Sequence, residues 1–197
     1  MNQNISDLIG RIKALDEELE KEFEKRREEF YFIIEKKRIR FAEEMIAAHK
    51  RLKTGLVRYI LDSHPLNILT APIIYAGFIP FLLLDLFVTL YQAVCFPVYG
   101  IPKVRRADYL VFGREELPYL NLIEKFNCFY CSYANGTASY VREIGARTEQ
   151  YWCPIKHARR IRDAHAHYNR FFEFGDAESF AMGLERLRKA LERNEAK

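Results

Sequence analysis

The sequence predicts a mainly α-helical protein with three parts. They are a long N-terminal coiled-coil helix (1–62), a membrane-embedded apolar hairpin (63–102) and a small helical domain stapled by a metal ion (103–197). Three observations support this. No proline occurs before Pro65, so nothing in the first part breaks a helix. The second part is almost wholly apolar. The third part contains cysteine and histidine residues with the spacing of metal ligands.

The composition narrows the possible classes of protein. The chain of 197 residues has 31 Lys and Arg against 27 Asp and Glu, a net charge of +4. So mild a basic excess does not indicate nucleic acid and fits approach to anionic lipid headgroups. Four cysteines are too few for a disulfide scaffold. The polar, acidic N-terminus does not have the pattern of a signal peptide, and metal-bound thiolates favour a reducing compartment. We therefore expect the protein on the cytoplasmic face of a membrane.

Residues 5–62 have the periodicity of one long helix. Apolar residues first follow an a/d pattern and then shift register by four positions, which locally unwinds a coiled coil. The first group is Ile5, Leu8, Ile12, Leu15 and Leu19, and the second is Phe23, Phe30, Ile34, Phe41, Met45, Leu52 and Leu56. Such a helix cannot bury its apolar stripe alone. We expect it to pair with a second copy, with another protein or with the rest of this chain.

The apolar run from Leu66 to Pro102 divides into two legs, 66–77 and 80–97, at the break Gly77-Phe-Ile-Pro80. The second leg would measure about 27 Å as a helix, barely the thickness of a bilayer core. Basic residues flank the run on both sides: Lys50, Arg51, Lys53 and Arg58 before it, and Lys103, Arg105, Arg106 and Arg114 after it. The positive-inside rule then predicts a re-entrant hairpin with both flanks in the cytoplasm. The alternatives are a single span and a buried hairpin of a soluble protein.

Two residues of this run are candidates for a special role. Asp85 is its only charged residue, and an acid within a membrane segment is a functional candidate by default. In a shallow hairpin it could instead face water or pair with a neighbouring arginine. Cys95 lies near the end of the second leg, and we expect it to be an inert buried thiol.

The C-terminal part is predicted to be a loop followed by four helices. Gly113 and Pro118 interrupt the loop, and Asn135-Gly136 separates the first two helices. Gly175 and Asp176 are expected to separate the last two, with Asp176 as the N-cap of an amphipathic helix that carries Phe180, Leu184, Leu187 and Leu191. The predicted ranges are 103–119 for the loop and 120–133, 137–150, 154–172 and 177 onwards for the helices.

A metal site is predicted from Cys128, Cys131, Cys153 and His157. The first two are three residues apart and the last two are four apart, so each pair shares one face of a helix. Between the pairs, about six extended residues lead outwards by roughly 20 Å, and a helix of about thirteen residues returns by roughly 20 Å. A closed Cys3His set is typical of structural zinc. Iron or an iron–sulfur cluster is the alternative cofactor.

These observations predict a non-enzymatic role, since no phosphate loop, nucleophile elbow, kinase motif or dinucleotide fingerprint occurs. The leading hypothesis is a membrane-anchored, zinc-binding scaffold or adaptor that oligomerises or recruits a partner through its N-terminal helix. The alternative is a membrane-associated redox protein with iron at the same four ligands. A third, weaker hypothesis is an RNA-binding module that uses the basic patch of Lys156, Arg159, Arg160 and Arg162.

Overall fold

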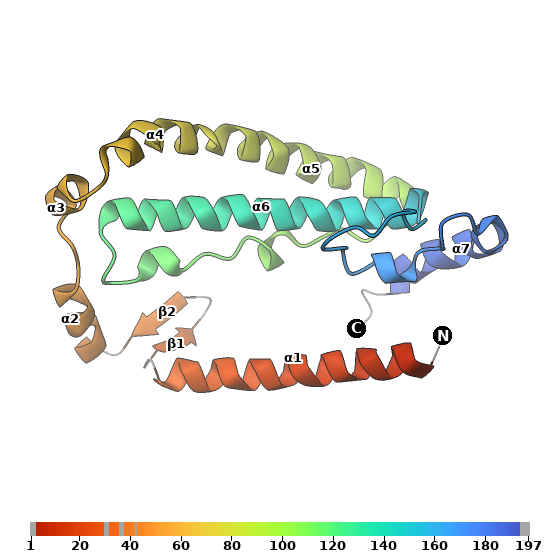
Figure 1. Ribbon diagram of the computed structural model, residues 1–197, viewed down its shortest axis with the longest axis horizontal. Coiled ribbons are helices and arrows are strands. Elements are labelled where there is room, and N and C mark those ends of the chain that lie inside the picture. The colour runs from red at the N-terminus through yellow and green to blue at the C-terminus, as the bar shows by residue number, and fades with distance from the viewer. Residues whose placement is uncertain (1–2, 30–31, 36–37, 42, 194–197) are drawn as a thin grey trace. The chain divides into compact units, whose positions relative to one another are not determined.

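The computed structural model divides the chain into two compact units, and each is described by itself. The residues described are 3–29, 32–35, 38–41 and 43–193. The first unit contains residues 1–61 and 113–125, and the second contains residues 62–112 and 126–197. The structure is mainly helical, which confirms the predicted class (Figure 1). The apolar run and most of the C-terminal region thus belong to one unit.

The first unit does not contain the single helix that the sequence predicted over 5–62. Helix α1 (Gln3–Glu29) is followed by two antiparallel strands and by two short helices. These elements are β1 (Phe32–Glu35), β2 (Arg38–Phe41), α2 (Glu43–Arg51) and α3 (Leu56–Leu61). The prediction of one helix is therefore wrong beyond Glu29. Phe30, a member of the predicted apolar stripe, lies outside the described residues.

The composition of residues 32–41 explains this correction. The two strands are rich in phenylalanine and isoleucine, which fit a pleated strand better than a helix. Their register opposes Phe32 to Phe41 and Glu35 to Arg38. Helical periodicity in this segment was a weak guide, because the same apolar spacing also fits a hairpin whose two strands pair.

The second unit begins with two helices that continue one another. Helix α4 (Pro65–Ala76) starts at the N-cap His64, whose Nδ1 accepts a hydrogen bond from the Leu66 amide at 3.3 Å. Helix α5 (Phe78–Tyr99) follows after Gly77, which has helical backbone angles. The two helices form one bent segment (Figure 1), without the chain reversal that the sequence predicted at this point. The apolar residues therefore do not form a hairpin with two antiparallel legs.

Helix α6 (Leu122–Trp152) lies beside α5 and runs parallel to it, because the segment after α5 returns the chain to the start of that helix (Figure 1). It begins with a capping box, in which the Asn121 amide donates to Glu124 and the Glu124 amide donates to Asn121. The break predicted at Asn135-Gly136 is wrong, because α6 continues through both residues. The side-chain amide of Asn135 donates a hydrogen bond from Nδ2 to the Cys131 carbonyl at 2.9 Å, one turn earlier. Gly136 serves close packing instead, since a Cβ there would lie 2.9 Å from the Tyr109 carbonyl oxygen.

Two irregular segments complete the second unit around these helices. The segment 101–112 follows α5 and contains the short 3-10 turn η1 (Arg106–Asp108), as the loop prediction expected. A second turn, η2 (Arg114–Glu116), belongs to the first unit. Residues 153–176 were predicted to be helical to residue 172, which is wrong. They form a parallel bridge between Ile155 and Phe172 and the turn η3 (Tyr168–Arg170).

The last helix, α7 (Ala177–Arg193), starts where the sequence predicted. The Asp176 carboxylate accepts a hydrogen bond from the Ser179 amide at 3.0 Å, and Gly175 has a φ of 88°. The hydrogen bonds from Ser179 hold the pKa of Asp176 below its ordinary value. The main core of the unit joins α5, α6, α7 and the segment 101–112. Its buried residues are Val88, Phe96, Ile101, Val104, Leu110, Tyr133, Tyr140, Ile144 and Leu191.

Candidate membrane-facing helix and its polar interior

The outer side of α5 is apolar and exposed. Seven large apolar residues of α5 each have between 59% and 76% of their surface accessible. These residues are Ile79, Leu83, Leu86, Phe87, Leu90, Val94 and Val98. Soluble monomers rarely expose so many apolar side chains along one face of a helix. By length and composition, the segment Pro65–Tyr99 is the one helical segment of the described residues that could cross a membrane.

The inner side of α5 carries the polar residues of the helix. Its buried residues are Asp85, Val88, Gln92 and Phe96, which are three or four positions apart and so form one stripe. Asp85 and Gln92 are each only 6% exposed. The helix is thus inverted relative to a surface helix of a soluble protein, with polar groups inside and leucines outside.

Asp85 is held by an arginine and a tyrosine from two other segments. Arg106 donates from Nε at 3.0 Å and from Nη2 at 2.6 Å, one bond to each carboxylate oxygen. Tyr133 of α6 donates its hydroxyl hydrogen to Oδ2 at 3.0 Å. The expectation that Asp85 pairs with a neighbouring arginine is confirmed. These bonds compensate a carboxylate that would be costly to bury alone.

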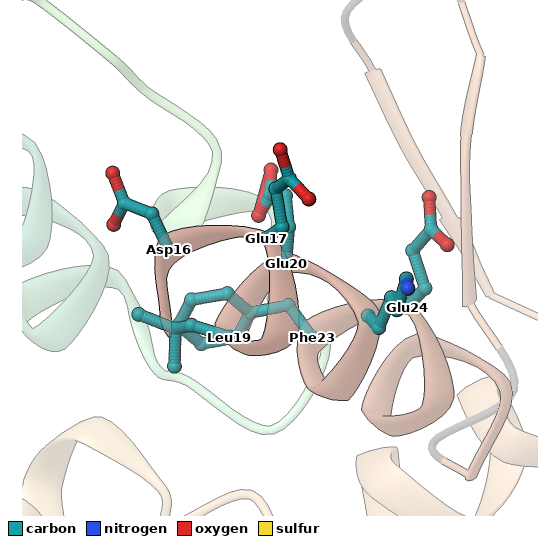
Figure 2. Close-up of a pocket in the computed structure, with 7 residues that line it drawn as sticks. Asp16, Glu17, Leu19, Glu20, Phe23 and Glu24 are labelled. Atoms are coloured by element: carbon teal, nitrogen blue, oxygen red, sulfur yellow. The ribbon is translucent and has the colours of Figure 1, made fainter. Parts of the chain in front are cut away.

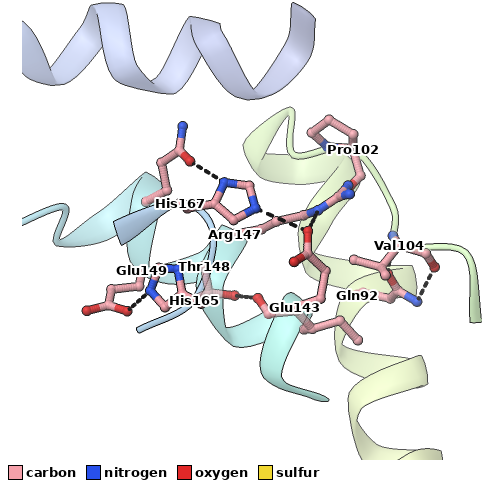
Figure 3. Close-up of polar contacts among 11 residues, drawn as sticks. Gln92, Pro102, Val104, Glu143, Arg147, Thr148, Glu149, His165 and His167 are labelled. Atoms are coloured by element: carbon pink, nitrogen blue, oxygen red, sulfur yellow. Dashed lines mark hydrogen bonds and ion pairs between the residues drawn. The ribbon is translucent and has the colours of Figure 1, made fainter. Parts of the chain in front are cut away.

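Gln92 fixes the segment 101–112 to α5. Its Oε1 accepts a hydrogen bond from the Val104 amide at 2.8 Å, and its Nε2 donates to the Val104 carbonyl at 3.3 Å (Figure 3). The same Nε2 contacts the hydroxyl of Tyr140 on α6. One side chain therefore satisfies both backbone groups of Val104, as a neighbouring strand would. Sequence reasoning missed Gln92, although its seven-residue spacing from Asp85 places both on one helix face.

A second polar cluster lies at the C-terminal half of α6 (Figure 3). His167 contacts Gln150 Oε1 through Nδ1 at 2.7 Å and Glu143 Oε1 through Nε2 at 3.1 Å. Gln150 donates its Nε2 to the Leu187 carbonyl, which orients its oxygen towards the histidine. Both contacts of His167 are hydrogen bonds together only when both ring nitrogens carry a proton.

Arg147 links this cluster to the segment that directly follows α5. It donates from Nε to Glu143 at 2.9 Å and from Nη1 to the Pro102 carbonyl at 2.7 Å. Burial by itself raises the pKa of Glu143, but the hydrogen bonds from His167 and Arg147 outweigh it. The pKa of Glu143 therefore lies below its ordinary value of 4.5. The cluster anchors residues 153–176 to α6, and His165 adds a further contact to Glu149 at 2.9 Å.

The four predicted metal ligands lie at two places. Cys128 and Cys131 are on α6, half-buried and exposed respectively. Cys153 directly follows the end of α6 and is exposed. Because α6 is continuous, Cys131 and Cys153 are about 33 Å apart at roughly 1.5 Å per residue. The fourth ligand, His157, contacts the Tyr168 hydroxyl through Nδ1 at 3.2 Å.

The structure therefore keeps the two predicted ligand pairs apart. Within the described ranges, no three His, Cys, Asp or Glu side chains are grouped so that they could hold a metal ion. The two legs of equal length that were expected between the pairs do not exist, since Asn135-Gly136 is helical. Zinc or iron binding by these residues stays a prediction. Cys95, expected to be a buried thiol, is half-buried on α5.

Aromatic rings gather where α5 and α6 end together. Tyr99 of α5 contacts Tyr151 and Trp152 of α6, with ring centroids 5.4 Å and 5.2 Å apart. The Arg188 guanidinium lies 4.6 Å from the centre of the Tyr151 ring. Tyrosine and tryptophan with exposed edges are typical of the boundary between the acyl chains and the headgroups of a bilayer. Trp152 is 52% exposed.

Comparisons with known proteins give this chain no relatives from which a role could be transferred. No family model matches it, and no curated protein or solved structure matches it significantly.

Proposed function

We propose that this protein is a membrane-anchored adaptor, in which α4 and α5 attach the chain to a bilayer and α1 recruits a partner. The observation that carries the proposal is the inverted polarity of α5. Each inward polar side chain of this helix has a partner within the chain, whereas its leucines face outwards without one. That pattern stabilises a helix surrounded by acyl chains and would be unfavourable in water.

The attachment that fits these features best is insertion into one leaflet. Residues 65–99 would span about 52 Å as a helix, well beyond a hydrocarbon core of about 30 Å. Arg142, Glu143 and Arg147 of α6 lie along the neighbouring helix, and charged side chains are costly at the centre of a bilayer. We therefore propose that the outer face of α5 lies in the acyl region while α6 remains towards the headgroups.

The charges at both ends of the apolar segment support the cytoplasmic leaflet. Basic residues precede α4 and follow α5 in similar number. The positive-inside rule favours one side of the membrane for both flanks, and anionic lipids on that side attract them. This arrangement retains the predicted topology with both ends of the chain in the cytoplasm, although it needs no hairpin.

The apolar stripe of α1 supports recruitment of a partner. Ile12, Leu15, Leu19 and Phe23 are between 51% and 63% exposed. Figure 2 shows Leu19 and Phe23 beside one another, with the carboxylates of neighbouring acidic residues extending away from them. The side chains of Ile5 and Leu8 lie outside the described residues. An a/d stripe of this kind is stabilised by a second helix of the same kind.

Charge complementarity makes a second copy of α1 the partner we propose. With Ile12 and Leu19 at a positions, Arg11 is at g and Asp16 at the following e position. In a parallel pair, g faces the e position five residues later in the other helix, so Arg11 would face Asp16 of the second copy. Anchoring on a membrane raises the effective concentration of such a pair.

Flotation with vesicles of phosphatidylcholine and phosphatidylserine tests the anchor. We expect the protein to float with vesicles, and Leu83→Lys with Leu90→Lys to reduce the bound fraction at least about tenfold, since each lysine costs up to about 3 kcal/mol. Met182→Lys on α7 is the matched control, because Met182 is 79% exposed and lies on a helix that the proposal leaves outside the membrane. Wild-type protein that stays at the bottom of the gradient without detergent would exclude the anchor.

The molecular mass of the protein in detergent, corrected for bound detergent, tests the α1 pair. Ile12→Asp with Leu15→Asp is expected to give monomers, whereas Ala14→Asp, on the opposite side of the helix, leaves dimers. Arg11→Glu and Asp16→Arg should each weaken the dimer, and the double variant should restore it. A wild-type monomer would show that α1 pairs with another protein or not at all.

A further inference from the structure

A groove runs between α5 and α6 within the second unit. It is a shallow, open groove with a volume of about 410 Å3, which is within the range of ligand sites. Its walls are largely apolar and come from three residues of α5 and six of α6. They are Phe87, Val88, Tyr91, Val141, Ile144, Gly145, Thr148, Glu149 and Trp152.

The polar groups of this groove already have partners. The Thr148 hydroxyl lies 2.8 Å from the Ile144 carbonyl, one turn earlier, and 3.1 Å from the Tyr91 hydroxyl. Glu149 contacts His165 at 2.9 Å (Figure 3). A polar ligand would thus have to displace contacts that the chain makes with itself. The lining favours an occupant without hydrogen-bonding groups.

Gly145 keeps the groove open in the C-terminal third of α6. Glycine in a helix interior is about 1 kcal/mol less favourable than alanine. Gly136 has a reason in close packing, but a Cβ at Gly145 would have no atom within 4 Å. Packing within the chain therefore does not require glycine at this position. The open space suits an occupant that lies against the helix backbone.

The groove is continuous with the outer face of α5. Phe87 belongs to both, and 67% of its surface is exposed. At the other end of the groove, Trp152 belongs to the aromatic group that marks the proposed headgroup boundary. From Val141 to Trp152 the α6 wall is about 17 Å long at roughly 1.5 Å per residue. An extended alkyl chain could enter from the acyl region and follow this wall.

We propose that the groove between α5 and α6 binds one acyl chain of a membrane phospholipid. The proposal rests on the membrane anchor and names the lipid contact that the anchor makes. The outer face of α5 contacts bulk lipid, whereas the groove holds a single acyl chain against Gly145. Binding covers Phe87 and Val141 without leaving a polar group unpaired, so it is favoured by van der Waals contacts of the acyl chain along the groove.

Trp152 provides the measurement, because it is the only tryptophan of the chain and lines the groove. The protein is kept in non-aromatic detergent micelles and titrated with phosphatidylcholine that carries dibrominated acyl chains, which quench nearby tryptophan. We expect quenching of the Trp152 fluorescence to saturate at one lipid per protein molecule. Gly145→Leu should fill the groove and reduce the quenching at least about threefold, a loss of roughly 0.65 kcal/mol or more in binding.

Two variants control for bulk and for helix propensity. Ser139→Leu adds the same side chain at an exposed position of α6 outside the groove and should quench like wild type. Gly145→Ala should retain most of the quenching, because a methyl group occupies little of the groove. Circular dichroism of each variant verifies that the helices are intact.

The possible outcomes separate this proposal from the anchor. Quenching that does not saturate, or that Gly145→Leu leaves unchanged, overturns the acyl-chain site whether or not the protein floats. Saturable quenching that Gly145→Leu abolishes supports the site, and flotation then tests the anchor separately. If Gly145→Leu instead converts a dimer to a monomer, the groove binds a second copy of the chain and the lipid proposal fails.

Discussion

Arg106 and Asp85 form a bidentate ion pair that links the segment after α5 back to the middle of that helix. The guanidinium Nη2 lies 2.6 Å from one carboxylate oxygen, and Nε lies 3.0 Å from the other. The two side chains differ in exposure, since 46% of the Arg106 side chain is accessible but only 9% of the Asp85 side chain. The arginine can therefore reach solvent or headgroups alone, and the aspartate cannot.

This asymmetry predicts unequal effects of the two single substitutions. Arg106→Gln leaves a buried carboxylate without its cation and should cost about 3 kcal/mol or more. Asp85→Asn leaves a half-exposed guanidinium and should cost about 1–2 kcal/mol. Denaturant unfolding in detergent measures both, and the double variant should recover part of the loss. Equal, near-zero effects would mean that the pair does not stabilise the unit.

The lowered pKa of Glu143 predicts a loss of stability in acid. A carboxyl group with a depressed pKa in the folded state contributes stability above its unfolded pKa, near 4.5, and loses it as the pH falls through the folded value. The melting temperatures of wild type and Glu143→Gln should thus differ most near neutral pH and converge as the pH falls below the folded-state pKa of Glu143. A difference that is constant with pH would show that Glu143 acts through packing alone.

The two interior glycines of α6 predict opposite responses to alanine. At Gly136 a Cβ would lie 2.9 Å from the Tyr109 carbonyl oxygen and 3.0 Å from the Leu110 Cα, so Gly136→Ala should destabilise the unit by about 1–3 kcal/mol. Gly145→Ala meets no atom and should stabilise it by up to about 1 kcal/mol. Thermal unfolding of the two variants decides this, and destabilisation by both would indicate a general need for glycine in α6.

The separation of the cysteine pairs predicts independent thiol chemistry. In wild type, Cys153 is exposed and about 33 Å from Cys131, so its alkylation rate should not change in a Cys128→Ser, Cys131→Ser variant. Mass spectrometry of iodoacetamide-treated protein gives this rate, and metal analysis of the same samples gives zinc and iron. Faster alkylation of Cys153 together with loss of one metal ion per chain would support the Cys3His site and a break in α6.

Local signals in the sequence predicted local structure well. Asp176 and Gly175 marked the start of α7, because an N-cap and a positive φ depend on adjacent residues. For Asp85, the single acid of the apolar run, pairing with a neighbouring arginine was one of the alternatives, and the structure shows that pair. These features needed little knowledge of distant contacts.

Features that depend on tertiary contacts were not predicted. Asn135-Gly136 reads as a turn, but Gly136 serves the close approach of the segment 101–112 to α6. The spacing of Cys128 and Cys131 is compatible with a metal site, yet whether Cys153 returns to them depends on that turn. His167 and Glu143 are 24 residues apart, and no pattern in the sequence links them.

The direction of synthesis gives the inward polarity of α5 a consequence for assembly. Asp85 needs Arg106, which is 21 residues later in the chain, and Gln92 needs Val104 and Tyr140, 12 and 48 residues later. Synthesis of α5 is therefore complete before any of these partners has been added to the chain. If α5 entered a bilayer at this stage, the Asp85 carboxylate and the Gln92 amide would enter the acyl region without hydrogen-bond partners, which is costly. Stable docking of α5 must wait until α6 has been translated, so α5 is synthesised well before its polar side chains acquire their full set of partners.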